Sequence, residues 1–182
     1  ALKEALVLLL LFGLLDAACW LFLCRRQEVE AWLWENRMIV LSLFALLFVV
    51  QLPMTMNYVP KGYDLRFHFY RIYAIAEGLR DGVFPVRIHP EWFNGYGYAT
   101  GIFYGDALLY LPAVLYLLGF SMGTAYKVYL LFINCFTIGN AFFCFRKMSG
   151  DRYTGLFGTV LYTASLHRLV ALYTRAAVGA YT

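Results

Sequence analysis

Long stretches without a charged side chain constrain this chain more than any other feature. No Lys, Arg, Asp or Glu occurs in residues 38–60 or 128–145, and the apolar run 5–24 is interrupted only by Asp16. An α-helix needs about 20 predominantly apolar residues to cross a bilayer. Only 14% of the 182 residues are charged, against about 25% in soluble domains. The sequence therefore predicts an all-α integral membrane protein.

Charge bias between the runs predicts the topology. Cytoplasmic loops carry an excess of Lys and Arg, which places the connection before residue 38 and the basic turn at residues 146–152 inside. Both are cytoplasmic only if residues 107–120, too short to cross a bilayer, lie along the outer surface. We expect four spans, in residues 5–24, 38–60, 128–145 and 153–173, with both termini outside.

Three regions follow from this topology. Residues 1–56 hold two transmembrane helices and a short cytoplasmic connection. Residues 57–127 form an outer loop with interfacial helices at about 64–80 and 107–120, and residues 128–182 hold two further spans. The rest of the bundle is expected in a longer protein.

Several function classes are excluded or disfavoured. The net charge of +4 is too small to indicate a nucleic-acid groove. The sequence contains no GxxxxGK[ST] or GxGxxG loop, so ATP-driven transport by this chain is disfavoured. No cofactor is certain from the sequence.

The segment from Gly62 to Arg80 is the best candidate for chemistry. Helical spacing places Asp64, His68 and Arg71 on one stripe beside an apolar stripe. A carboxylate there can act as a base on an acceptor hydroxyl, and Arg suits a phosphate leaving group. The alternative is that Asp64 only caps the helix. A divalent metal held by Asp64 and His68 is a further alternative.

Other candidate residues lie outside that helix. Arg87 and Arg175 are cations available to a phosphate, although charge at a headgroup surface explains them equally well. The Gly/aromatic run 92–105 contains Tyr96 and Tyr98, whose rings could stack on a ring-shaped ligand or form an interfacial aromatic belt. Both interpretations stay open.

These motifs resemble a known group. In order along the chain they are Gly-Tyr-Asp64-x-x-x-His68-x-x-Arg71, Gly82-x-x-Pro85-x-Arg87, Asn94-Gly-Tyr-Gly-Tyr98, Phe103-Tyr104 and Leu108-x-Tyr110-Leu-Pro112. The arrangement resembles the amino-terminal region of bacterial YfhO-like proteins and of the membrane family labelled "6-pyruvoyl-tetrahydropterin synthase related". Both groups resemble the GT-C glycosyltransferase superfamily.

The resemblance implies a GT-C-like partial helical bundle in the bacterial cytoplasmic membrane, with its active site on the outer face. Asp64 would be the catalytic base and His68, Arg71, Arg87, Tyr96, Tyr98 and Arg175 would bind substrate. The donor would be a polyprenyl-phosphate sugar, and the acceptor a hydroxyl on a glycan, polymer or lipid. The chain departs from related sequences at Ala180, where they carry an acidic residue.

Two alternatives to this enzyme are considered. A lipid-linked glycan transporter would use the same cationic surface without a base, and a non-catalytic assembly subunit would use the aromatic loop to hold a partner.

Overall fold

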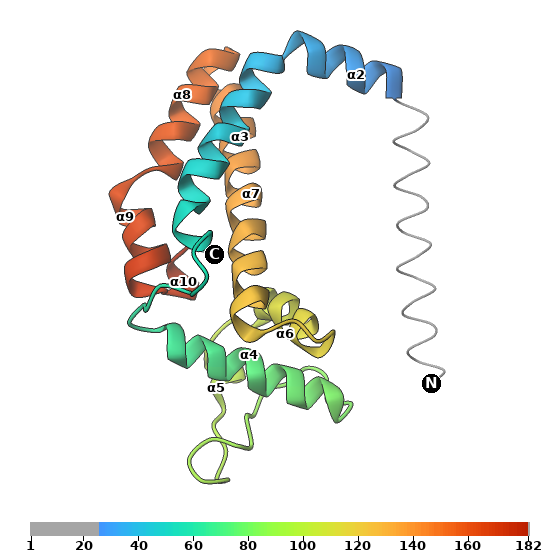
Figure 1. Cartoon of the computed structure of the whole chain (residues 1–182), viewed down its shortest axis with the longest axis vertical. Coiled ribbons are helices and arrows are strands. Elements are labelled where there is room, and N and C mark those ends of the chain that lie inside the picture. Colours follow the sequence, from blue (N-terminus) through green and yellow to red (C-terminus); the bar gives the residue numbers. More distant parts are fainter. Residues whose placement is uncertain (1–25, 182) are drawn as a thin grey trace. The chain divides into compact units, whose positions relative to one another are not determined.

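The computed structural model describes residues 26–181, in the order shown in Figure 1. The chain divides into two compact units, Ala1–Ser42 and Leu43–Thr182, which are described separately. Regular structure in the described residues is helical, apart from one isolated antiparallel bridge between His89 and Tyr98. The all-α prediction is confirmed for this part of the chain. The first expected span, residues 5–24, lies outside it.

The described part of the first unit consists of α2 (Arg26–Glu35) and the start of α3 (Arg37–Gln51). An exposed ion pair joins Arg26 and Glu30 one turn apart, at 2.7 Å. This helix is the charged connection expected before the second span.

Two described helices are long and apolar enough to cross a membrane. One is Arg37–Met54, in which α3 continues into the 3-10 turn η1 (Leu52–Met54). The other is α7 (Met122–Ser149), whose 28 residues correspond to about 42 Å at 1.5 Å per residue. Large apolar side chains are exposed on α7, as in lipid-facing helices, among them Phe136 and Phe143. The protein is therefore a membrane protein.

A third candidate span is broken. It consists of α8 (Arg152–Thr163) and the segment Leu166–Arg175, bent by 46° relative to each other. The second half contains α9 (Leu166–Leu169) and the π-helix η3 (Val170–Arg175). The expected span 153–173 is therefore either a bent span or a re-entrant loop.

The turn between α7 and α8 is specified locally. Gly150 ends α7 in the left-handed conformation, at φ 71°. Asp151 then caps α8, accepting a hydrogen bond from the Thr154 N–H at 2.7 Å. A Cβ on Gly155 would lie 2.8 Å from Arg146 Cα, so this glycine allows the two helices to pack closely.

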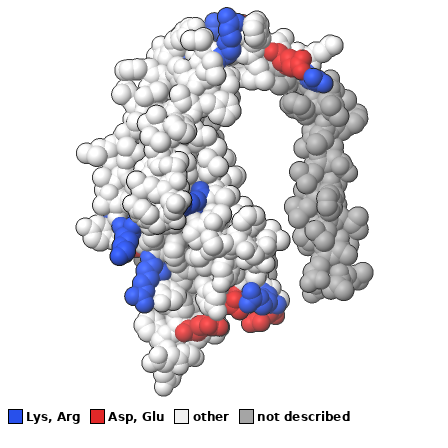
Figure 2. Space-filling model, in the orientation of Figure 1, with Lys and Arg blue, Asp and Glu red and all other residues white. Residues whose placement is uncertain are grey.

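Charged side chains gather at the two ends of the second unit, with the buried Arg168 between them. Arg146 and Lys147 are at the end of α7 that meets α8, whereas α4 (Leu65–Arg80) crosses the opposite end of α7 (Figure 1). On the face in Figure 2 the region between these ends is white except for one basic patch. This distribution is typical of a membrane-spanning bundle.

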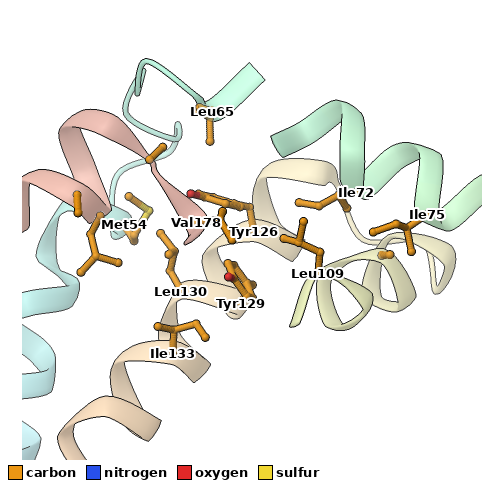
Figure 3. Packing of buried hydrophobic residues seen from close by; sticks show 14 of the residues in the cluster. Met54, Leu65, Ile72, Ile75, Leu109, Tyr126, Tyr129, Leu130, Ile133 and Val178 are labelled. Carbon is orange, nitrogen blue, oxygen red and sulfur yellow. The ribbon is translucent and has the colours of Figure 1, made fainter. Parts of the chain in front are cut away.

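The core of the second unit lies where α4, α6 (Tyr110–Leu117) and α7 meet. Figure 3 shows Ile72 and Ile75 of α4 on the side of Leu109, with Tyr126 and Tyr129 of α7 beside them. All five are at most 1% exposed. The apolar stripe of α4 therefore packs on the bundle.

The segment expected at residues 107–120 forms a 3-10 turn, η2 (Ala107–Leu109), followed by α6. Eight helical residues cover about 12 Å, so α6 cannot cross a bilayer. Pro112 lies in its first turn, where proline is tolerated. An interfacial position of α6 stays a prediction.

A polar network joins the helices inside the second unit. Arg168 donates to Asn134 Oδ1 at 2.7 Å, and Asn134 donates to Gln51 Oε1 at 2.7 Å. Tyr173 donates to the Val50 carbonyl. The network connects the end of α3 to α7, α9 and η3, and so holds the bent segment in place.

Candidate active site

Asp64 lies directly before α4 and beside a segment from the other end of the chain. Its N–H donates to the Arg175 carbonyl at 2.9 Å, and the Tyr63 N–H donates to the Thr174 carbonyl at 3.2 Å. Gly62 permits this approach, because a Cβ there would lie 2.5 Å from the Ala176 Cβ. The structure therefore brings together the predicted residues Asp64 and Arg175.

The Asp64 side chain does not cap the helix through a hydrogen bond. At φ −97° and ψ 1° the residue lies outside the extended region typical of N-caps, and no helix N–H donates to its carboxylate. The side chain is half-buried, and the neighbouring Arg175 side chain is exposed. A carboxylate left without its capping bond can accept a proton from a ligand.

His68 is buried one turn further along α4. Its Nε2 accepts from the Val178 N–H at 3.4 Å, and its Nδ1 lies 3.3 Å from Arg71 Nη1. Burial, and then the charge of Arg71, lower the pKa of His68 to about 4, while Asp64 opposes the shift. A neutral imidazole has one acceptor nitrogen and faces two donors here. Only one of these contacts can be a hydrogen bond at a time, because Val178 faces Nε2, Arg71 faces Nδ1, and the tautomer leaves an acceptor lone pair on just one of them.

Arg71, predicted as a cation for the phosphate, is buried against Asp106. The guanidinium is 1% exposed, forms a salt bridge with Asp106 and donates to the Gly105 carbonyl at 3.1 Å. The Phe67 and Tyr104 rings lie 5.7 and 5.2 Å from its central carbon. In this arrangement Arg71 and His68 position α4, and neither presents a free polar group to solvent.

Asp106 is the site residue that sequence reasoning missed. It stands at the head of the apolar run 107–120, which gave no sign of its partner 35 residues earlier. A usable signal was Arg71 itself, because an arginine between core positions of a helix needs a counter-ion.

More polar groups surround this ion pair. His89 and Thr100 are at most 1% exposed, and burial lowers the pKa of His89, while Asp106 raises it and Arg71 lowers it. Among the described residues, neither the His89 nitrogens, nor Thr100 Oγ1, nor Asp106 Oδ2 makes a hydrogen bond to the protein. Arg71, Asp106, His89 and Thr100 therefore form a buried polar cluster.

Arg87 lies with this cluster and not with Asp64. It is exposed and lines a cavity of about 500 Å³ together with Gly101, Asp106 and Tyr110. A Cβ on Gly101 would lie 2.6 Å from the Val86 carbonyl oxygen and 2.7 Å from Asp106 Oδ2, which explains the glycine.

The two predicted tyrosines occupy different environments. Tyr98 pairs with His89 through two backbone hydrogen bonds, and its ring packs 5.2 Å from that of Trp92. Tyr96, at the tip of the loop, is 92% exposed and lines none of the cavities described here. Tyr98 therefore has a structural role in the loop.

The structure does not support the alternative that Asp64 and His68 hold a divalent metal. Within residues 26–181 no three His, Cys, Asp or Glu side chains lie close enough together to hold a metal ion. Both His68 nitrogens face donors of the chain, so the Asp64–His68 pair is poorly arranged for a cation.

Comparison with known proteins gives no relative. No protein-family model, curated protein or solved structure matches this chain.

Proposed function

We propose that this chain is a GT-C-like glycosyltransferase that takes a sugar from a polyprenyl-phosphate donor and transfers it to a hydroxyl group of a glycan, polymer or lipid. One observation carries the proposal. Asp64 is a half-buried carboxylate without a capping hydrogen bond, at the start of a helix that crosses the end of a candidate membrane span (Figure 1). A lipid-borne donor and a fixed base can meet at such a position.

The chemistry follows from the groups present. Asp64 takes the proton of the acceptor hydroxyl as the oxygen bonds to the anomeric carbon of the sugar. The bond from that carbon to the phosphate oxygen breaks, and its electron pair leaves with the lipid phosphate. The exposed Arg175, whose backbone carbonyl accepts a hydrogen bond from the Asp64 N–H, is an available cation for the developing phosphate charge. Arg87 lies at a separate cavity, so we assign the phosphate role to Arg175 first.

The side of the membrane on which Asp64 lies is inferred from the two ends of α7. Arg146 and Lys147 are at one end of α7, and α4 crosses the other end. We therefore propose that the basic turn lies in the cytoplasm and Asp64 at the outer face of a bacterial cytoplasmic membrane, and the positive-inside rule supports this orientation.

Turnover of a lipid-phosphate sugar tests the proposal. We expect the full-length protein in lipid nanodiscs to consume polyprenyl-phosphate sugars, and Asp64→Asn to lose nearly all transfer. Asp81→Asn is a matched control, because Asp81 follows the other end of α4. A glycan transporter or an assembly subunit would instead show no turnover, and glycan export or partner capture would be unaffected by Asp64→Asn.

A further inference from the structure

A separate cavity of about 400 Å³ lies along α4, beyond the residues that surround Asp64. Its volume is within the range of roughly 300–1,000 Å³ found for small-ligand sites. Four aromatic side chains, a carboxylate and an amide line it: Tyr70, Tyr73, Glu91, Trp92, Phe93 and Asn94. This combination offers apolar ring faces beside hydrogen-bonding groups.

The Trp92 indole is held in a fixed position by other rings. Its ring centroid lies 5.7 Å from Phe67, 5.8 Å from Tyr70 and 5.2 Å from Tyr98. Tyr70 belongs to α4, and Tyr98 belongs to the far side of the loop. A ring fixed from several sides loses little conformational freedom when a ligand binds.

The backbone beside Trp92 is strained where it meets the cavity. Phe93 and Asn94 adopt left-handed conformations, at φ 53° and 57°. Asn tolerates this region, but a bulky residue such as Phe rarely adopts it, and such strain is concentrated at functional sites. The Gly97 N–H donates to the Trp92 carbonyl at 3.0 Å and closes the turn. The Phe93 side chain is 63% exposed.

The charge of this cavity disfavours an anion. Glu91 is exposed at its edge, and none of the described lining residues is Lys or Arg. The charges of Glu77 and Glu91 raise the pKa of Tyr73, so its phenol stays protonated and able to donate. A phosphate or uronate would meet the Glu91 carboxylate here, and the neighbouring cation Arg66 already donates to the Tyr70 hydroxyl at 3.2 Å.

We propose that this cavity binds a neutral sugar residue of a glycan, stacked on Trp92 and Tyr70 and hydrogen-bonded through Tyr73, Glu91 and Asn94. A quaternary ammonium group would also be attracted to rings and a carboxylate. It is much smaller than the cavity and has no use for the amide or the phenol. The observations therefore favour the sugar.

The cavity serves a sugar distant from the reacting hydroxyl. Tyr70 and Tyr73 lie about 9 and 14 Å further along the helix axis than Asp64, at 1.5 Å per residue. During the reaction the cavity would therefore hold a sugar of the acceptor glycan that lies several bonds away from the attacking oxygen. This role rests on the proposed glycosyl transfer, whereas sugar binding itself does not.

Fluorescence of Trp92 tests the binding directly. The full chain carrying Trp20→Phe, Trp32→Phe and Trp34→Phe has Trp92 as its single tryptophan. We expect a saturable change in its emission with at least one tetrasaccharide of glucose, galactose, mannose or N-acetylglucosamine, in the absence of donor. Tyr73→Ala should weaken that affinity at least tenfold. Tyr153→Ala, an exposed tyrosine of α8, is the control and should leave it unchanged.

The outcomes separate the two proposals. Three results would overturn this inference. One is that Trp92 emission changes with none of the four tetrasaccharides, and another is that it changes with choline chloride instead. The third is that Tyr73→Ala and the control Tyr153→Ala bind the tetrasaccharide with equal affinity. Asp64→Asn should bind the tetrasaccharide like the parent chain and lose transfer. If the parent chain binds the tetrasaccharide but shows no turnover, the proposed glycosyl transfer is wrong and the proposed sugar site stands.

Discussion

Two carboxylates beside α4, those of Asp64 and Asp106, are treated by the fold in opposite ways. Asp64 is half-buried, bonded to the chain through its backbone, and its carboxylate makes no capping hydrogen bond. Asp106 is 9% exposed and paired with the buried Arg71. The Asp106 carboxylate is committed to this ion pair, because without it the Arg71 charge would be buried and uncompensated. The proposed reactive carboxylate of Asp64 and the structural carboxylate of Asp106 therefore differ in their partners and not in their residue type.

The largest expected effect is the loss of activity in Asp64→Asn. Loss of a general base typically lowers the rate by about 10²- to 10⁴-fold. Stability should change by less than about 1 kcal/mol, because no capping bond is lost. Transfer rate and denaturant unfolding of the same preparation measure both quantities. An active Asp64→Asn variant would remove the difference between the two carboxylates.

Asp106→Asn should show the reverse pattern. It leaves the Arg71 charge buried without its partner, which costs about 3–5 kcal/mol of stability. Unfolding in mild detergent should reveal the loss, and the double variant Arg71→Met/Asp106→Leu should recover most of it. Unchanged stability of the single variant would contradict a structural role for this ion pair.

Gly62→Ala tests the contact that places Asp64 beside Arg175. The added Cβ would overlap the Ala176 Cβ at 2.5 Å, and overpacking of this kind costs about 1–3 kcal/mol. Activity should fall as well, since the Tyr63 and Asp64 backbone bonds must shift. Gly139→Ala, with open space around the new Cβ, is the control. Ala176→Gly should restore stability to the Gly62→Ala chain if the overlap is the cause.

The most gradual expected effect is the pH dependence due to His68, which is spread over more than two pH units. Its folded pKa of about 4 is below the unfolded value of about 6.5, so the unfolded state binds more protons between them. Stability therefore falls as the pH drops from about 6.5 towards 4, by at most about 1.4 kcal/mol per pH unit. Burial lowers the pKa of His89 too, and adds in the same direction. His68→Gln should flatten the slope relative to the exposed control His167→Gln.

Local patterns were sufficient for several features. The helix expected at 64–80 is α4, and the stripe spacing placed Ile72 and its apolar neighbours in the core. The apolar runs 38–60 and 128–145 overlap the two unbroken candidate spans of the described chain, Arg37–Met54 and Met122–Ser149. Periodicity and run length depend only on residues a few positions apart, so one sequence carries them.

The sequence by itself determined that this is a helical membrane protein with polar residues on one stripe of α4. Only the tertiary structure decided what those residues do. Arg71 meets Asp106 across 35 positions, and Asp64 meets Arg175 across 111. The physical reason is that a helical repeat fixes which face a side chain occupies, whereas its counter-ion, burial and pKa depend on segments brought alongside by packing. Whether a carboxylate on that face is held in an ion pair or left free is therefore a property of the folded chain.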